Sequence, residues 1–162
     1  PCPPYYGAKA LALGLYRAAA LAGRGRTSAS ILDDPRVLRS PVDPYRIGRP
    51  YWTRGAGLVE LPIAVTRGLR LPFIGTSVAL AGERGAETLA AMLAGRPLVH
   101  FELHGIDLAD AAADGLEALR PHQPDLRKSA REKEAALRRA VARLRAAGHR
   151  FVTLRDAAET FA

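Results

Sequence analysis

The residue best placed for chemistry is His104, which directly follows the apolar hexapeptide LVHFEL at residues 98–103. These six residues are expected to form a β-strand, so the His104 imidazole is expected to stand at its C-terminal end. Parallel α/β proteins assemble active sites at such strand ends and in the loops that follow them. Because histidine exchanges a proton near neutral pH, His104 is a candidate general acid or base. The alternative is a structural histidine bonded to a loop carbonyl.

Two further polar residues lie on the predicted strand. Side chains alternate between the two faces of a strand, so His100 and Glu102 are expected to share the face that ends at His104. Polar groups on a buried strand need partners, because an unpaired buried charge is costly. His100 and Glu102 could join a site with His104 or pair structurally below it, and the structural interpretation is favoured. Glu60 could be a buried carboxylate or a solvent-facing residue, and the solvent-facing interpretation is preferred.

The spacing of His104, Asp107 and Asp110 could also suit a metal ion. A carboxylate three residues after a histidine is common in loops, however, and Asp107 could equally cap the helix that follows. His122 and His149 lie in a proline-flanked loop and after a helix end, and neither is given a role. The sequence contains no phosphate-binding loop, paired-cysteine zinc motif, serine-hydrolase elbow or dinucleotide-binding glycine motif. These absences argue against the common nucleotide-binding and serine-hydrolase classes.

The elements expected to position His104 alternate between strands and helices, which indicates an α/β fold with parallel strands. An alanine- and leucine-rich helix is expected to follow residues 1–6 and to end near residues 23–25. A long connection with room for one short helix then covers residues 24–57. Residues 72–80 are ambiguous and could begin a helix. Further helices are expected at residues 86–93, 109–119 and 156–161, and strands at residues 57–65, 98–103 and 151–154.

The clearest helix prediction concerns the segment from Ser129 to Ala147. Ser129 and Glu132 have the spacing of a capping box, which satisfies two backbone N–H groups at a helix start. Gly148 is expected to end the helix. Its buried stripe is expected to comprise Leu137, Ala140, Val141, Leu144 and Ala147.

The composition is typical of one soluble globular domain over residues 1–162, with 48% hydrophobic and 25% charged residues. The net charge of +8 could attract phosphates or acidic polymers through the overall field. The basic residues are almost all arginines and are scattered among acidic ones, and few aromatic residues are available to stack on bases. No nucleic-acid partner is therefore expected.

The chain carries few signals of its cellular compartment. Cys2 is the only cysteine, so no internal disulfide is possible and the redox compartment stays open, with the cytoplasm slightly favoured. No run of about twenty apolar residues is present, so no membrane span is expected. The chain begins at Pro1 rather than at Met, and its N-terminus is expected to be a cut within a longer protein.

Three stretches carry a family resemblance: GLVELPIAVTRGLRLPFIGTS at residues 57–77, PLVHFELHGID at residues 97–107 and AVARLRAAGHRFVTLRDAAETF at residues 140–161. Together they resemble the C-terminal half of polysaccharide deacetylases of the NodB-homology type. The opening PCPPYY is similar to the segment that follows the fourth motif of that family. The strand that ends in Leu103 and His104 is the most specific part, because it matches the Leu-His pair of the fifth motif.

The resemblance implies the incomplete C-terminal part of a deformed (β/α) barrel from a metal-dependent hydrolase that removes N- or O-acyl groups from a sugar or glycan. His104 would be the general acid that protonates the leaving group, Leu103 would line the acyl pocket, and Asp107 is placed at the substrate pocket. The family's divalent metal, zinc, would be bound by motifs that have no matching position here, so no metal ligand is assigned in this chain. The alternatives are a non-catalytic carbohydrate-binding relative and a basic module that binds an anionic polymer.

Overall fold

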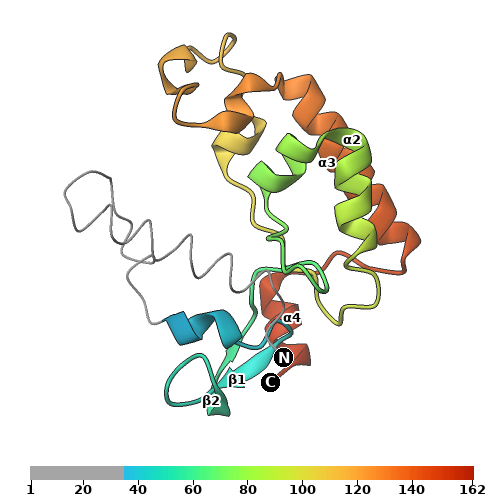
Figure 1. Cartoon of the computed structure of the whole chain (residues 1–162). Helices are drawn as coiled ribbons and strands as arrows, with labels where there is room; N and C mark the ends of the chain where they lie inside the picture. Colours follow the sequence, from blue (N-terminus) through green and yellow to red (C-terminus); the bar gives the residue numbers. More distant parts are fainter. Residues whose placement is uncertain (1–34) are drawn as a thin grey trace, which may run out of the picture. The chain divides into compact units, whose positions relative to one another are not determined.

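The computed structural model describes residues 35–162 (Figure 1). Cys2 and the helix expected after residues 1–6 lie outside the described residues. Three α-helices and one pair of antiparallel strands give the described part a mixed α and β content. The predicted (β/α) barrel stays a prediction. In chain order the elements are η2 (Pro35–Arg39), β1 (Tyr45–Ile47), β2 (Arg54–Glu60), α2 (Gly75–Ala91), η3 (Gly105–Leu108), η4 (Glu117–Leu119), η5 (Pro124–Arg127), α3 (Ala130–Ala146) and α4 (Leu154–Thr160), where η marks a 3₁₀ helix.

The described residues fall into two compact units. One contains residues 35–41 and Arg46–Leu58, and the other contains Val42–Tyr45 and Val59–Ala162. His104 and every residue that surrounds it belong to the second unit, so the site is described within that unit alone. Among the described helices, none combines the length and the apolar character that crossing a membrane requires.

Strands β1 and β2 form a hairpin within the segment that was expected to be mostly a long connection. Gly55 and Gly57 lie so close to the opposite strand that a Cβ on either would collide with its backbone, which explains glycine inside a strand here. The strand predicted over residues 57–65 is wrong in its bounds, since β2 ends at Glu60. Pro62 follows two residues later and lacks the N–H that would continue the ladder. Glu60 is exposed, as the preferred interpretation expected.

Helices α2 and α3 lie side by side and form the core of the second unit (Figure 1). The ambiguous residues 72–80 include the start of α2, which also contains most of the helix predicted at residues 86–93. Gly82 kinks α2 with a φ of 64°, a backbone conformation that glycine adopts without steric cost. Small side chains let the two helices approach closely. The buried cluster comprises Ala64, Phe73, Val78, Ala86, Ala90, Leu93, Ala136, Ala140 and Leu144.

Helix α3 confirms the capping prediction. The Ser129 hydroxyl accepts a bond from the Glu132 N–H, and the Glu132 carboxylate accepts one from the Ser129 N–H at 2.9 Å. The Ser129 N–H and, at 2.9 Å, the Ser129 hydroxyl both donate to the Glu132 carboxylate, and these two bonds hold the pKa of Glu132 below its usual range. Gly148 ends the helix with a φ of 88°. Of the predicted stripe, Ala140 and Leu144 are buried and the rest is half-buried, while the unexpected Lys133 is fully buried on the same face.

The segment 98–103 is extended, but it is not the regular strand that was predicted. His100 forms a single parallel bridge with Ile63, and Glu102 forms one with Ile74. Both bridges are parallel, whereas the one regular sheet of the described residues, β1 and β2, is antiparallel. The pairing stays local because Pro62 and Pro72 interrupt the neighbouring segments, where neither can donate a backbone hydrogen bond.

Two other predicted elements are wrong. Residues 109–116 form turns instead of a helix, and only the short η4 (Glu117–Leu119) lies within the predicted range. The Asp114 N–H makes one α-type bond to the Asp110 carbonyl, and Gly115 then turns the chain with a φ of 68°. The strand predicted at residues 151–154 is absent from the described structure. Thr153 instead caps α4 by accepting a bond from the Asp156 N–H at 3.1 Å, so α4 begins at Leu154.

Candidate functional site

His104 lies where the extended segment 98–103 meets the 3₁₀ helix η3. The bridge between Glu102 and Ile74 directly precedes it, and the Gly75 N–H donates to the Glu102 carbonyl at 2.8 Å. These contacts fix the backbone immediately before His104 on the start of α2. The His104 side chain itself is 62% exposed. The structure therefore combines a fixed backbone with an imidazole that solvent or a ligand can reach.

Each ring nitrogen of His104 faces a carboxylate. The Nε2 atom lies 3.6 Å from Glu102 Oε1, and the Nδ1 atom lies 3.6 Å from Asp107 Oδ2. When the ring is protonated, it has an anion beside each of its two N–H groups, which restricts its orientation. Glu102 was expected to pair with His100, and the structure corrects this by placing Glu102 beside His104.

Asp107 is held more firmly than any other charged group near His104. Its side chain is only 1% exposed. Its Oδ2 atom accepts a bond from the His104 backbone N–H at 2.8 Å, and its Oδ1 atom accepts one from the Thr76 hydroxyl at 2.7 Å. The carboxylate also lies directly against Gly75, where there is no room for a Cβ. Asp107 does not cap a helix that follows it, as was considered from the sequence. It lies within η3, and its carboxylate accepts the His104 N–H at the start of that element.

A small cavity adjoins this carboxylate. Leu103 and Asp107, both assigned to a substrate pocket from the sequence, line it together with Phe101 and Leu108. The cavity volume is about 10 Å³, close to the smallest space that holds one water molecule. Leu103 and Leu108 are 42% and 43% exposed, so they also present apolar surface beside His104.

His100 and Asp110, which were considered from the sequence as neighbours of His104, do not join the site. The His100 Nδ1 atom lies 2.7 Å from the Leu61 carbonyl oxygen, which can only accept, so Nδ1 carries the proton. This bond agrees with the structural interpretation of His100. Asp110 accepts bonds from the backbone N–H groups of Ala113, Ala130 and Ala112, which hold its pKa below the usual range.

The carboxylates of Asp107 and Asp110 each accept bonds from backbone N–H groups, and the spacing considered for a metal ion does not gather them into one cluster with His104. Residues 35–162 contain no cluster of three or more His, Cys, Asp and Glu side chains that could hold a metal ion.

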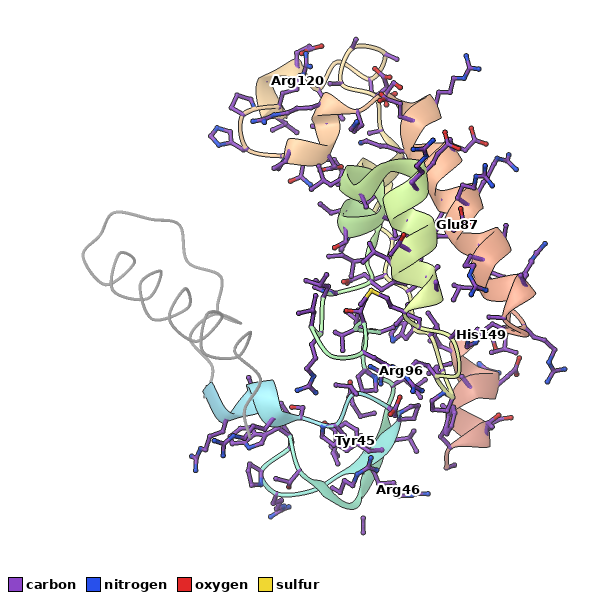
Figure 2. All side chains as sticks on the ribbon, turned by 45° about the vertical axis from the view of Figure 1, so that its right-hand side comes forward. Tyr45, Arg46, Glu87, Arg96, Arg120 and His149 are labelled. Atoms are coloured by element: carbon purple, nitrogen blue, oxygen red, sulfur yellow. The ribbon has the colours of Figure 1, made fainter. Side chains whose placement is uncertain are left out.

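The remaining histidines lie elsewhere in the second unit. His122 is exposed in the loop between η4 and η5. His149 is half-buried just past the end of α3 (Figure 2), and its Nε2 atom is buried without a hydrogen-bond partner. Neither approaches the carboxylates that flank His104.

Sequence reasoning missed three residues that support the site. Thr76 binds Asp107, while the buried Lys133 and Asp125 form an ion pair of 3.2 Å beneath η3. Nothing in the sequence marks Thr76. Lys133 could have been found, because it precedes Leu137 by four residues and so falls on the apolar stripe of α3, where an unpaired charge would be costly.

Comparison of the chain with protein-family models, curated proteins and solved structures finds no match. The fold and the geometry around His104 therefore carry the functional argument by themselves.

Proposed function

We propose that this chain forms the C-terminal part of a metal-dependent carbohydrate deacetylase, in which His104 is the general acid. The observation that carries the proposal is the pair of His104 and Asp107. An accessible imidazole has a fully buried, hydrogen-bonded carboxylate 3.6 Å from its Nδ1 atom. A fixed acid or base partner beside an exposed histidine is the arrangement that proton transfer in acyl hydrolysis requires.

In the proposed reaction, the oxygen of a water molecule forms a bond to the acyl carbon, and the bond from that carbon to the sugar nitrogen or oxygen then breaks. The attacking water gives up a proton to a base, which we place with the metal ligands outside this chain, and His104 donates the proton that the leaving nitrogen or oxygen takes up. Glu102 and Asp107 each lie 3.6 Å from one ring nitrogen, and they would orient the imidazole for that transfer. Leu103 and Leu108, which are exposed and line one small cavity with Asp107, would supply an apolar surface that suits the methyl end of an acetyl group.

The proposed reaction needs a divalent metal ion, and its ligands are proposed to lie outside this chain. The divalent ion, zinc by resemblance, would activate the attacking water and stabilise the charge on the acyl oxygen. Residues 35–162 do not fit as its ligands, because they contain no group of three or more His, Cys, Asp and Glu side chains that could hold the ion. We therefore assign the ligands to the part of the deacetylase outside this chain.

The test is acetate release from N-acetylated chito-oligosaccharides by the full-length protein. We expect metal-dependent release, and we expect His104→Gln to lower kcat by roughly 10²- to 10⁴-fold, the range for loss of a positioned proton donor. His122→Gln is the matched control, because His122 is also exposed but lies in a separate loop. Equal kcat values for wild type and His104→Gln would end the assignment of His104 as the acid.

A further inference from the structure

Beneath η3 lies a buried lysine whose contacts lead back to the site. Lys133 is 1% exposed on the inner face of α3. Its ammonium group donates to the Ile106 carbonyl at 3.1 Å, to the Ala109 carbonyl at 2.8 Å and to Asp125 Oδ2 at 3.2 Å. An ammonium group has three N–H donors, so these three acceptors satisfy it completely.

Two of the three acceptors belong to η3, the element that carries Asp107, and to its C-terminal cap residue. The Ile106 carbonyl directly precedes Asp107 in the chain, and the Ala109 carbonyl follows it by two residues. Lys133 therefore binds the backbone on both sides of Asp107. The side-chain contacts of Asp107 with Thr76 and with the His104 N–H come from the opposite direction, at the start of α2 and at the end of the extended segment.

We infer that Lys133 is a positioning residue for the proton-transferring pair of His104 and Asp107, an inference that rests on the proposed function. Two of its three bonds join α3 to the backbone at Ile106 and Ala109, and the third joins α3 to Asp125 in η5, so the position of the Asp107 carboxylate depends in part on α3. Asp125 is the counter-ion that makes a buried ammonium group tolerable at this place.

Stability alone does not require a buried ion pair of Lys133 and Asp125 beneath η3. A buried lysine and aspartate are often replaced by apolar residues at little cost in stability, whereas removal of one partner leaves an unpaired charge that strongly destabilises the fold. Lys133→Met with Asp125→Leu removes both charges together and also removes both bonds to the loop carbonyls. This double variant separates positioning of the loop from stabilisation of the core.

The experiment measures the His104 ring directly, by the ¹H–¹³C NMR signal of its Cε1 group in the full-length protein, alongside kcat and KM for deacetylation. In the double variant we expect the His104 signal to shift and kcat to fall by about 10- to 100-fold, with KM little changed, because small misplacements of a catalytic group have effects of that size. The control is Leu93→Ala, which opens a cavity in the core away from η3 and should lower Tm without moving the His104 signal.

Several outcomes overturn the inference. A folded double variant with the wild-type His104 signal and kcat would do so. If the double variant does not fold, scalar couplings across hydrogen bonds decide the matter in the wild-type protein. Couplings from Lys133 Nζ to the carbonyl carbons of Ile106 and Ala109 support the inference, and their absence overturns it. The wild-type protein could lack deacetylase activity while its His104 signal still shifts in the double variant. That result would refute the proposed function but not the positioning of His104 and Asp107 by Lys133.

Discussion

His104 and Asp107 are three residues apart in the chain but have opposite surroundings. The His104 side chain is 62% exposed, while that of Asp107 is 1% exposed and bound on both of its oxygens. An exposed histidine contributes little to packing, so its substitution should affect chemistry more than stability. A buried carboxylate with two donors is different, because its removal leaves a hydroxyl and a backbone N–H without their partner.

The first prediction concerns how His104 acts. If it protonates the leaving group, the loss of kcat in His104→Gln should be smaller for aryl esters than for N-acetyl sugars, since a phenolate leaves without help from an acid. Rates for both substrate classes in the wild type and the variant provide the measurement. An equal loss for both classes would contradict the role of a proton donor.

His100→Ala is the control for that experiment. His100 binds the Leu61 carbonyl and lies on the same extended segment, four residues before His104. Its loss should lower the free energy of unfolding by about 1 kcal/mol, the usual net contribution of a hydrogen bond. All substrates should then be affected about equally, which distinguishes a structural histidine from a catalytic one.

At the scale of elements, the start of α2 meets η3 at Gly75. A Cβ at this position would collide with the Asp107 carboxylate. We therefore predict that Gly75→Ala lowers stability by roughly 1–3 kcal/mol through overpacking, although alanine favours helix formation more than glycine does. Thermal unfolding measures this effect.

Gly105→Ala is the matched control, because it places the same methyl group on the other side of His104. The space around Gly105 is open within 4 Å. We expect its Tm to stay near that of the wild type. A Gly75→Ala variant as stable as Gly105→Ala would show that η3 can move away from α2 at no cost.

The stability of the first turn of α3 is expected to depend on pH through the carboxylate of Asp110. The carboxylate of Asp110 accepts a bond from the Ala130 N–H in the first turn of α3, and backbone donors hold its pKa below the usual range. Folding thus favours the charged form. The stability that Asp110 contributes is present above its unfolded pKa and is lost as the pH falls through the lower folded pKa.

We accordingly predict that Asp110→Asn is less stable than the wild type near pH 7 and that the difference shrinks on acidification below about pH 4. Thermal unfolding followed by circular dichroism across this range provides the measurement. Glu132 has a lowered pKa as well and remains in the variant, so some acid sensitivity should persist. A difference that grows towards low pH would contradict the sign of the Asp110 effect.

At the scale of the whole molecule, the site depends on three parts of the second unit: the start of α2, the loop after the extended segment, and α3. Together they hold His104 and Asp107 in place. They provide no set of metal ligands within residues 35–162. The positioning of His104 and the activation of water would therefore be supplied by different parts of the proposed deacetylase.

The isolated chain of 162 residues is accordingly predicted to release no acetate from chito-oligosaccharides and to bind Zn²⁺ only weakly, because a preorganised ligand set is missing. Acetate assays with added Zn²⁺ and calorimetric titration test this. Robust deacetylation by the isolated chain that a chelator abolishes would show that the site is complete within it.

Local sequence determined the elements whose signals lie within a few residues. The capping box of Ser129 and Glu132 started α3, and Gly148 ended it, because capping bonds and a positive φ act over one turn of chain. The same reasoning placed His104 at the end of an extended segment with parallel neighbours. It failed at most of residues 109–119, where Gly115 turns the chain with a positive φ, and at residues 151–154, where Thr153 caps α4 instead of extending a strand.

Tertiary structure alone decided how the site is supported. Thr76 and Lys133 are 31 and 26 residues from Asp107, in opposite directions along the chain. Thr76 binds the Asp107 carboxylate, and Lys133 binds the carbonyls of Ile106 and Ala109 on either side of it, because α2 and α3 both pack against η3. Their bonds are long-range, and no spacing in the sequence encodes which hydroxyl or ammonium group will meet a given loop. The sequence by itself determined which residue could exchange a proton. The packing of the two helices determined which residues hold that histidine and its carboxylate in place, since burial forces each buried polar group to find a partner nearby in space.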